Sequence, residues 1–165
     1  MNLTDFVAEA AGCGPCVGVH PQISSPLAPP DRVELRTISA AHATTLDGLF
    51  DAFAEAWDFP PWFGRNGGAF DDFMRDWDNM IDAAQGKPSA PGYLTDVRDA
   101  HLLLSEEPDA FPWFVNCIPF YREYYRDQED PTAAFGLLLS APTPRLDKVR
   151  ERWLYAGVEV ASINV

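Results

Sequence analysis

The segment at residues 134–141, AFGLLLSA, constrains the fold of this chain more than any other stretch. It is continuously apolar and lacks the alternation with polar residues that marks a strand exposed on one face. A run of this length and kind is typical of a strand that is buried on both faces, as in a parallel sheet covered by helices on either side. The segment therefore predicts an α/β fold.

The rest of the chain alternates between strand-like and helical patterns. Further strands are predicted at 32–39, where Val33 and Leu35 share one face, at 93–97 and at 158–165. Helical spacing of apolar residues is found at 46–57, 67–82, 99–127, which Pro108 and Pro119 are expected to break or kink, and 146–157. Strands separated by helices pair in parallel. We therefore expect a small parallel sheet of about three to four strands flanked by helices.

The stretch SSPLAPPD, residues 24–31, has the composition of an extended linker. It suggests that residues 1–31 form an N-terminal helix, an extended segment and a Pro-rich linker. The main domain is expected over 32–143, and 144–165 is expected to add a helix and a strand to that same domain. A chain of 165 residues is long enough to bury a single hydrophobic core.

The balance of charges limits the classes of partner. The chain has 25 acidic and 12 basic residues, a net charge of -13. Such a surface repels phosphate backbones, which disfavours direct nucleic-acid binding, and it attracts cationic partners. Ordinary solubility is the simpler explanation of the same charge. The N-terminus has neither a basic stretch nor a long apolar run, so we expect no membrane segment and a cytoplasmic location.

The tetrapeptide Cys13-Gly14-Pro15-Cys16 matches the CxxC motif of thiol–disulfide oxidoreductases. In those enzymes the motif follows a strand and begins a helix, whose N-terminus activates the first cysteine. Here a predicted short helix precedes the motif and an extended segment follows it. We interpret the pair as two reduced cysteines in a helix-to-strand turn and keep an oxidoreductase as an alternative. Cys117 and three scattered histidines show no second pair at zinc-ligand spacing, so no metal is expected.

Residues 59–82, FPPWFGRNGGAFDDFMRDWDNMID, join an aromatic, glycine-containing loop to an acidic helix. One helical stripe should face the core, and it consists of Phe70, Phe73, Met74, Trp77 and Ile81. Aspartates occupy the remaining surface, with Asp72 and Asp76 one turn apart on the opposite face and Asp71, Asp78 and Asp82 beside them. Asn66 is a candidate N-cap for this helix.

Four interpretations of this acidic face compete. It could be an ordinary solvated helix surface, which is the usual meaning of a charge run. A carboxylate pair for acid–base catalysis would need a cleft that drives the two pKa values apart, and an exposed helix does not provide one. A cation site would need a third ligand. A binding surface for a basic partner agrees best with the net charge and the neighbouring aromatic residues.

The same stretch resembles the barstar family, intracellular inhibitors of the ribonuclease barnase. The family pattern is an apolar residue, a proline, an aromatic pair, a glycine, any residue and an asparagine, followed by a helix with an aspartate on its exposed side. The matching positions are Pro60 or Pro61, Trp62, Phe63, Gly64, Asn66, Ala69, Asp72 and Trp77. The resemblance covers residues 32–82 and extends more loosely through the strand near 140.

The resemblance implies an inhibitor without cofactors, not an enzyme. Its loop and second helix would plug the active site of a basic ribonuclease or nuclease toxin, as an immunity protein does. Asp72 falls on the principal inhibitory aspartate, Trp62 and Phe63 on the aromatic loop pair, and Asn66 on the loop asparagine. Glu123, in the sequence YRE, matches a glutamate of a later helix. Trp62 is the better candidate for an exposed anchor, since Phe63 could lie in the core.

Three positions depart from the family pattern, and one of them is Arg65, which replaces an acidic or neutral loop residue. Gly68 stands where a second helix aspartate is expected, and Asp71 stands where an exposed tryptophan is expected. Asp71 or Asp76 would have to compensate for the missing carboxylate. These departures keep open a barstar-like regulatory protein whose partner is not a nuclease. The predicted partner-binding residues are Trp62, Phe63, Asn66, Gly68, Asp71, Asp72, Asp76 and Glu123.

Overall fold

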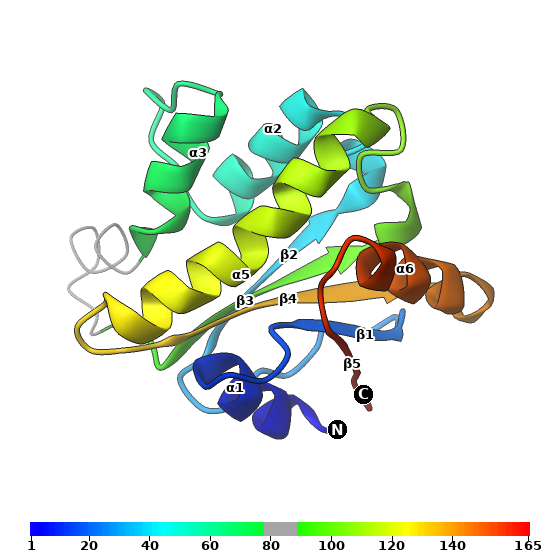
Figure 1. The fold of residues 1–165 in the computed structure, drawn as a ribbon, viewed down its shortest axis with the longest axis horizontal. Coiled ribbons are helices and arrows are strands. Elements are labelled where there is room, and N and C mark those ends of the chain that lie inside the picture. The colour runs from blue at the N-terminus through cyan, green and yellow to red at the C-terminus, as the bar shows by residue number, and fades with distance from the viewer. Residues whose placement is uncertain (78–88) are drawn as a thin grey trace.

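A single parallel sheet with helices on both faces forms the centre of the computed structural model, which describes residues 1–77 and 89–165 (Figure 1). Its strand order is β2-β3-β4-β1-β5. The strands are β1 (Val17–Pro21), β2 (Glu34–Ser39), β3 (Gly92–Arg98), β4 (Ala134–Ala141) and β5 (Val160–Ser162). Every neighbouring pair is parallel, which confirms the expected fold class. The sheet has five strands rather than three to four.

The fifth strand, β1, is the one that the sequence marked only as an extended segment after the CxxC turn. It lies between β4 and β5, with Val17 opposite Leu137 on one side and Val160 on the other. Its five residues include a glycine and end on a proline, so their pattern is too short to mark a strand. Residues 1–31 and 144–165 thus contribute strands to the same sheet as the segment between them, while the predicted boundaries at 31 and 143 stay predictions.

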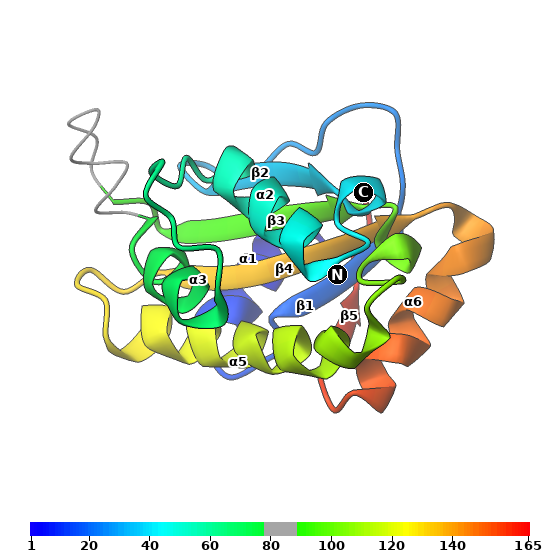
Figure 2. The same ribbon diagram turned by 90° about the horizontal axis from the view of Figure 1, so that it is seen from above.

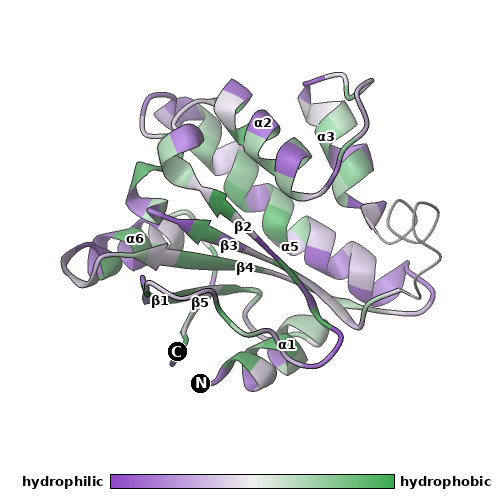
Figure 3. Cartoon of the chain, turned by 180° about the vertical axis from the view of Figure 1, so that it is seen from behind, coloured by the Kyte–Doolittle hydropathy of each residue, from purple (hydrophilic) through white to green (hydrophobic). Residues whose placement is uncertain are grey.

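The helices cover the two faces of the sheet unequally. They are α1 (Leu3–Ala11), α2 (Leu46–Ala56), α3 (Gly67–Met74), α5 (Phe111–Asp127) and α6 (Thr143–Tyr155). Figure 2 shows α2, α3 and α5 in front of the sheet and α1 behind it. The larger core lies under α2, α3, α5 and α6, and a smaller one forms around Phe6 of α1 on the other face. The helices α2 and α3 carry both hydrophobic and hydrophilic bands (Figure 3).

The helices α2 and α3 begin at residues 46 and 67, as predicted, whereas α5 begins at 111 and α6 at 143. Thr45 caps α2 and Asn66 caps α3, each accepting a hydrogen bond from a backbone N–H three residues later. The helix predicted over 67–82 is α3 up to Met74, and residues 78–82, with Asp78, Ile81 and Asp82, lie outside the described residues. Of the region predicted over 99–127, only α5 is a long helix, and it continues through Pro119.

Two short 3-10 helices, Ala100–Leu102 and Pro108–Ala110, replace the first part of that predicted helix. The backbone of Asp99 and Leu104 adopts positive φ angles of 53° and 52°. Because a left-handed residue cannot continue a right-handed α-helix, these two positions end regular structure there.

An aromatic cluster fixes α3 against α2 and α5. Phe70 of α3 is fully buried, and its ring lies 5.4 Å from Phe50, 5.5 Å from Phe53 and 5.9 Å from Trp113. Trp77 is buried as well and stacks on Trp57 at 3.7 Å. The predicted core stripe is therefore confirmed for its described residues, with Phe73 half-buried. Such packing holds the opposite face of α3 toward solvent.

Candidate partner-binding surface

The loop before α3 places its two aromatic residues in different environments. Trp62 is 78% exposed, whereas Phe63 is half-buried. The Phe63 ring lies 5.2 Å from Phe59, 5.8 Å from Phe50 and 5.8 Å from Phe73. Phe63 thus anchors the loop to the core, while Trp62 presents a large apolar surface that a partner could cover.

The end of this loop is held by side-chain contacts. Asn66 accepts a hydrogen bond from the backbone N–H of Ala69 at 2.9 Å and donates one to the carbonyl of Gly64 at 3.2 Å. Arg65 pairs with Asp51 of α2, and its guanidinium lies 3.5 Å from the carboxylate of Asp47. Asn66 therefore has a defined role as a cap, and the loop is fixed at its junction with α3.

The aspartates of α3 differ in what they contact. The side chain of Asp72 is 76% exposed, and its carboxylate lies 3.3 Å from the guanidinium of Arg75. Asp71 is half-buried and accepts a hydrogen bond from the hydroxyl of Tyr121 on α5. Burial, the neighbouring Cys117 and this hydrogen bond raise the pKa of Tyr121. Asp72 faces solvent, Asp71 joins two helices, and Asp76 is half-buried just after α3.

Gly68 leaves open space on the first turn of α3. A Cβ atom at this position would meet only the Oδ1 atom of Asn66, at an ordinary 3.5 Å. At the neighbouring Gly67, by contrast, a Cβ atom would lie 3.4 Å from the ring of Trp113. The carboxylate that the family pattern places at position 68 is thus missing although the structure has room for it.

A hollow of about 350 Å³ lies between the end of α3 and the C-terminal half of α5. It is lined by Arg75, Phe120, Glu123, Tyr124, Asp127 and Gln128. Glu123 is exposed, and its carboxylate makes no hydrogen bond or ion pair within the described ranges. Arg75 contacts Asp72 and also lines the hollow, so the structure brings Asp72 and Glu123 to one region of the surface.

Sequence reasoning missed the aromatic part of this hollow. Phe120 is 49% exposed, although phenylalanine is usually buried. Phe120, Tyr124 and Asp127 are spaced by four and three residues, so they share one side of α5. That spacing was visible in the sequence, but only the contact with α3 shows that this side forms a hollow with Arg75.

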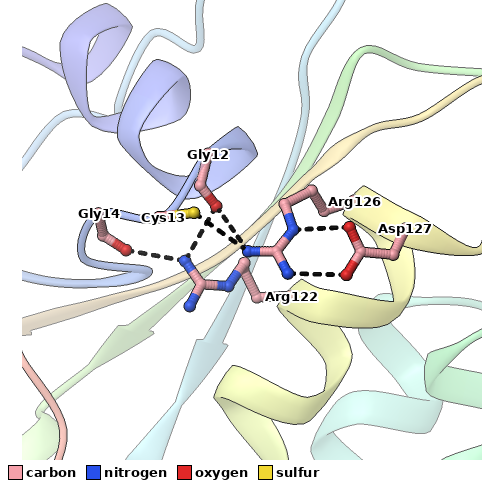
Figure 4. Close-up of polar contacts among 6 residues, drawn as sticks. All are labelled: Gly12, Cys13, Gly14, Arg122, Arg126 and Asp127. Atoms are coloured by element: carbon pink, nitrogen blue, oxygen red, sulfur yellow. Dashed lines mark hydrogen bonds and ion pairs between the residues drawn. The ribbon is translucent and has the colours of Figure 1, made fainter.

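The CxxC turn is attached to the other side of α5 (Figure 4). Arg122 donates hydrogen bonds to the carbonyl of Gly14 at 2.8 Å and to that of Gly12 at 3.3 Å. Arg126 donates to the Gly12 carbonyl at 3.1 Å and lies 3.6 Å from the Sγ atom of Cys13. These contacts give the turn a structural role in joining α1 and β1 to α5.

The cysteine pair lacks the following helix whose N-terminus activates the first thiol in redox enzymes. The helix α1 precedes the turn and β1 follows it, which confirms the predicted helix-to-strand turn. Cys13 is exposed, whereas Cys16 is buried, and its burial raises the pKa of its thiol to about 11. A buried, protonated thiol is a poor nucleophile. Only Cys13, which lies beside Arg126, is placed to act as a nucleophile, and the order of α1 and β1 gives it no helix N-terminus, which argues against the oxidoreductase alternative.

Residues 1–77 and 89–165 contain neither a metal-binding cluster nor a helix that could span a membrane. Within these ranges no three His, Cys, Asp or Glu side chains are grouped so that they could hold a metal ion. No helix in the same ranges combines the length and the apolar character needed to cross a membrane.

The fold and this surface define a class of protein: a small α/β domain that presents an aromatic loop and an exposed helix aspartate. Comparison with known families gives a match to the family described as Barstar (barnase inhibitor), over residues 33–136. Because the match covers more than half of the chain, the protein belongs to the barstar family. The matched region runs from just before β2 to the start of β4 and contains the loop and α3. A search of curated proteins gives no match.

Proposed function

We propose that this protein inhibits a basic ribonuclease by covering its active site with α3 and the aromatic loop, as an immunity partner of a nuclease toxin. Asp72 carries the proposal, because its carboxylate points to solvent from a helix whose other side is fixed in the core. A ribonuclease site is cationic, since it binds phosphate. An exposed carboxylate on a rigid helix can occupy a phosphate position in such a site.

The other residues of the surface contribute different kinds of contact with the partner. Trp62 supplies apolar contact at the loop, and Phe63 adds to it while holding the loop in place. Glu123 adds a peripheral acid on α5. The net charge of -13 steers a basic partner toward the protein, and this steering weakens as salt is added.

The surface is also organised before a partner binds. Asn66 caps α3, Phe70 anchors the helix in the core, and the hydroxyl of Tyr121 ties Asp71 to α5. Little conformational freedom is then lost on association, so more of the contact energy contributes to affinity.

Inhibition of barnase and capture of ribonuclease activity from native lysate test this proposal. The three baits are the wild type, Asp72→Ala and Asp147→Ala. Asp147 is a matched control because it is an equally charged, exposed residue on α6. Removing one partner of a desolvated charge pair costs about 2–5 kcal/mol of binding, so Asp72→Ala should lose inhibition or capture while its thermal stability stays nearly unchanged.

The outcome separates the candidate functions. Ribonuclease activity that is inhibited or captured by the wild type and by Asp147→Ala, but not by Asp72→Ala, supports the proposal. Equal behaviour of all three baits would remove Asp72 from the site. A non-nuclease protein captured by all three would favour the regulatory function that Gly68 keeps open.

A further inference from the structure

Arg75 lines the hollow between α3 and α5 and lies against its aromatic side. Its guanidinium lies over two aromatic rings, 5.6 Å from the centre of Phe120 and 5.3 Å from that of Tyr124. The same group lies 3.3 Å from the carboxylate of Asp72. Two ring faces and a carboxylate are the contacts by which proteins bind an arginine side chain. The aromatic side of the hollow is therefore covered by a guanidinium that belongs to the protein itself.

The contacts of Arg75 are of a kind that a competitor can replace. Its Nε atom donates a hydrogen bond to the carbonyl of Asp71 at 3.1 Å, so the side chain is held at the end of α3. Both Arg75 and Asp72 are in contact with solvent, and ion pairs of this kind contribute little to stability. A second guanidinium with further contacts elsewhere could take its place.

The hollow is acidic enough to hold such a cation. Glu123 lies on its rim with no ion pair in the described part of the chain, whereas Asp127 is engaged by Arg126 through contacts of 2.8 and 2.7 Å. Burial and the nearby carboxylates of Glu129 and Asp76 raise the pKa of Tyr124, and Arg75 opposes this effect. Glu123 is thus the carboxylate that an arriving cation would meet.

We propose that the two ring faces and the rim of the hollow form an arginine-binding subsite, whose rings Arg75 covers in the free protein and a partner's arginine covers in the complex. Arg75 then moves into solvent and Asp72 becomes free for the partner. This inference rests on the proposed function only in that the partner is cationic. It makes Arg75 a specificity-determining residue, because a partner must place an arginine here to displace it.

Binding of a tetra-arginine peptide tests the subsite without any nuclease. The peptide is titrated at low salt into the wild type, Arg75→Gln and Arg145→Gln, and NMR shifts of the ring protons report where it binds. Arg145 is a matched control because it is exposed on α6 and the substitution changes the net charge equally. Loss of a competing cation–π contact and an exposed ion pair predicts roughly three- to tenfold tighter binding to Arg75→Gln alone, with shifts at Phe120 and Tyr124.

A further substitution, Phe120→Ala in the Arg75→Gln protein, should remove this gain. Phe120 is half exposed, so its loss does not threaten the core. Equal gains from Arg75→Gln and Arg145→Gln would show an effect of total charge and would overturn the proposal. The same holds if no variant gains affinity, or if the peptide shifts other residues. Failure of ribonuclease inhibition with a working subsite would refute the proposed function alone.

Discussion

Replacing Gly68 with aspartate should stabilise the free protein slightly and add a carboxylate to the face that carries Asp72. The position lies on the first turn of α3, and a side chain there meets only Asn66 at van der Waals distance. The first turn of α3 contains no acidic residue, so the positive end of the helix dipole has no acidic partner there. The substitution therefore changes charge and backbone freedom without a steric penalty.

Three effects decide the magnitude. Aspartate is a few tenths of a kcal/mol better than glycine within a helix, because glycine loses more backbone freedom on folding. A negative charge in the first turn adds about 0.3–1 kcal/mol. Repulsion from Asp72, which is four residues away, costs about 0.2–0.5 kcal/mol. The sum is a gain of about 0.5 kcal/mol in the free energy of unfolding.

Urea denaturation of wild type, Gly68→Asp and Gly68→Asn measures this gain. Asparagine has nearly the size of aspartate but no charge, so the difference between the two variants isolates the effect of the helix dipole. At low salt the free energy of unfolding of Gly68→Asn should be lower than that of Gly68→Asp. At high salt the two variants should have the same free energy of unfolding, since salt screens the interaction of the charge with the dipole. A loss of more than about 1 kcal/mol in both variants would mean that the position is not open, and the reasoning would fail. Ribonuclease inhibition by Gly68→Asp then shows whether the added carboxylate strengthens binding.

Two further predictions concern buried groups. His20 is buried, with its Nδ1 atom 2.9 Å from the carbonyl of Pro21 and its Nε2 atom 3.2 Å from Asp96. Asp96→Ala should lower the free energy of unfolding, measured by urea denaturation, by about 3–5 kcal/mol. Asp96→Asn keeps a partner for Nε2 and should lower it much less. Burial raises the pKa of Cys16 and of Cys117 from 9.0 to about 11. Because both thiols stay protonated in the folded state while the unfolded chain ionises, stability should fall as pH rises from 9 to 11. Cys16→Ala should reduce that slope, and an unchanged slope would contradict the assignment. At neutral pH a thiol reagent should modify Cys13 alone.

Local sequence patterns predicted much of the framework correctly. The continuous apolar run of β4 is buried along its whole length, and its neighbours are parallel, as expected for that pattern. Thr45 and Asn66 cap their helices because a short polar side chain can satisfy a free N–H whatever the rest of the fold does. Spacing of 3.6 residues also placed Phe70 inside and Asp72 outside. Each of these properties depends on residues within one or two helical turns.

Other features depended on contacts between distant segments. The five residues of β1 gain their place between β4 and β5 from neighbours more than a hundred residues away, and Gly18 is needed there because a Cβ would approach Ile163 to 2.7 Å. Asp71 and Asp72 are adjacent aspartates of α3, yet only the carboxylate of Asp71 accepts a hydrogen bond from Tyr121. The guanidinium of Arg75 reaches the rings of α5 only because α3 packs on that helix.

The sequence alone therefore determined the α/β class, the starts of α2 and α3, the acidic face and the family resemblance, because periodicity, capping and charge are local properties. The tertiary structure decided which acids remain free for a partner and where the hollow lies. The physical reason is that a side chain's exposure and its neighbours depend on how whole elements pack, and neighbouring residues in the chain do not fix that packing.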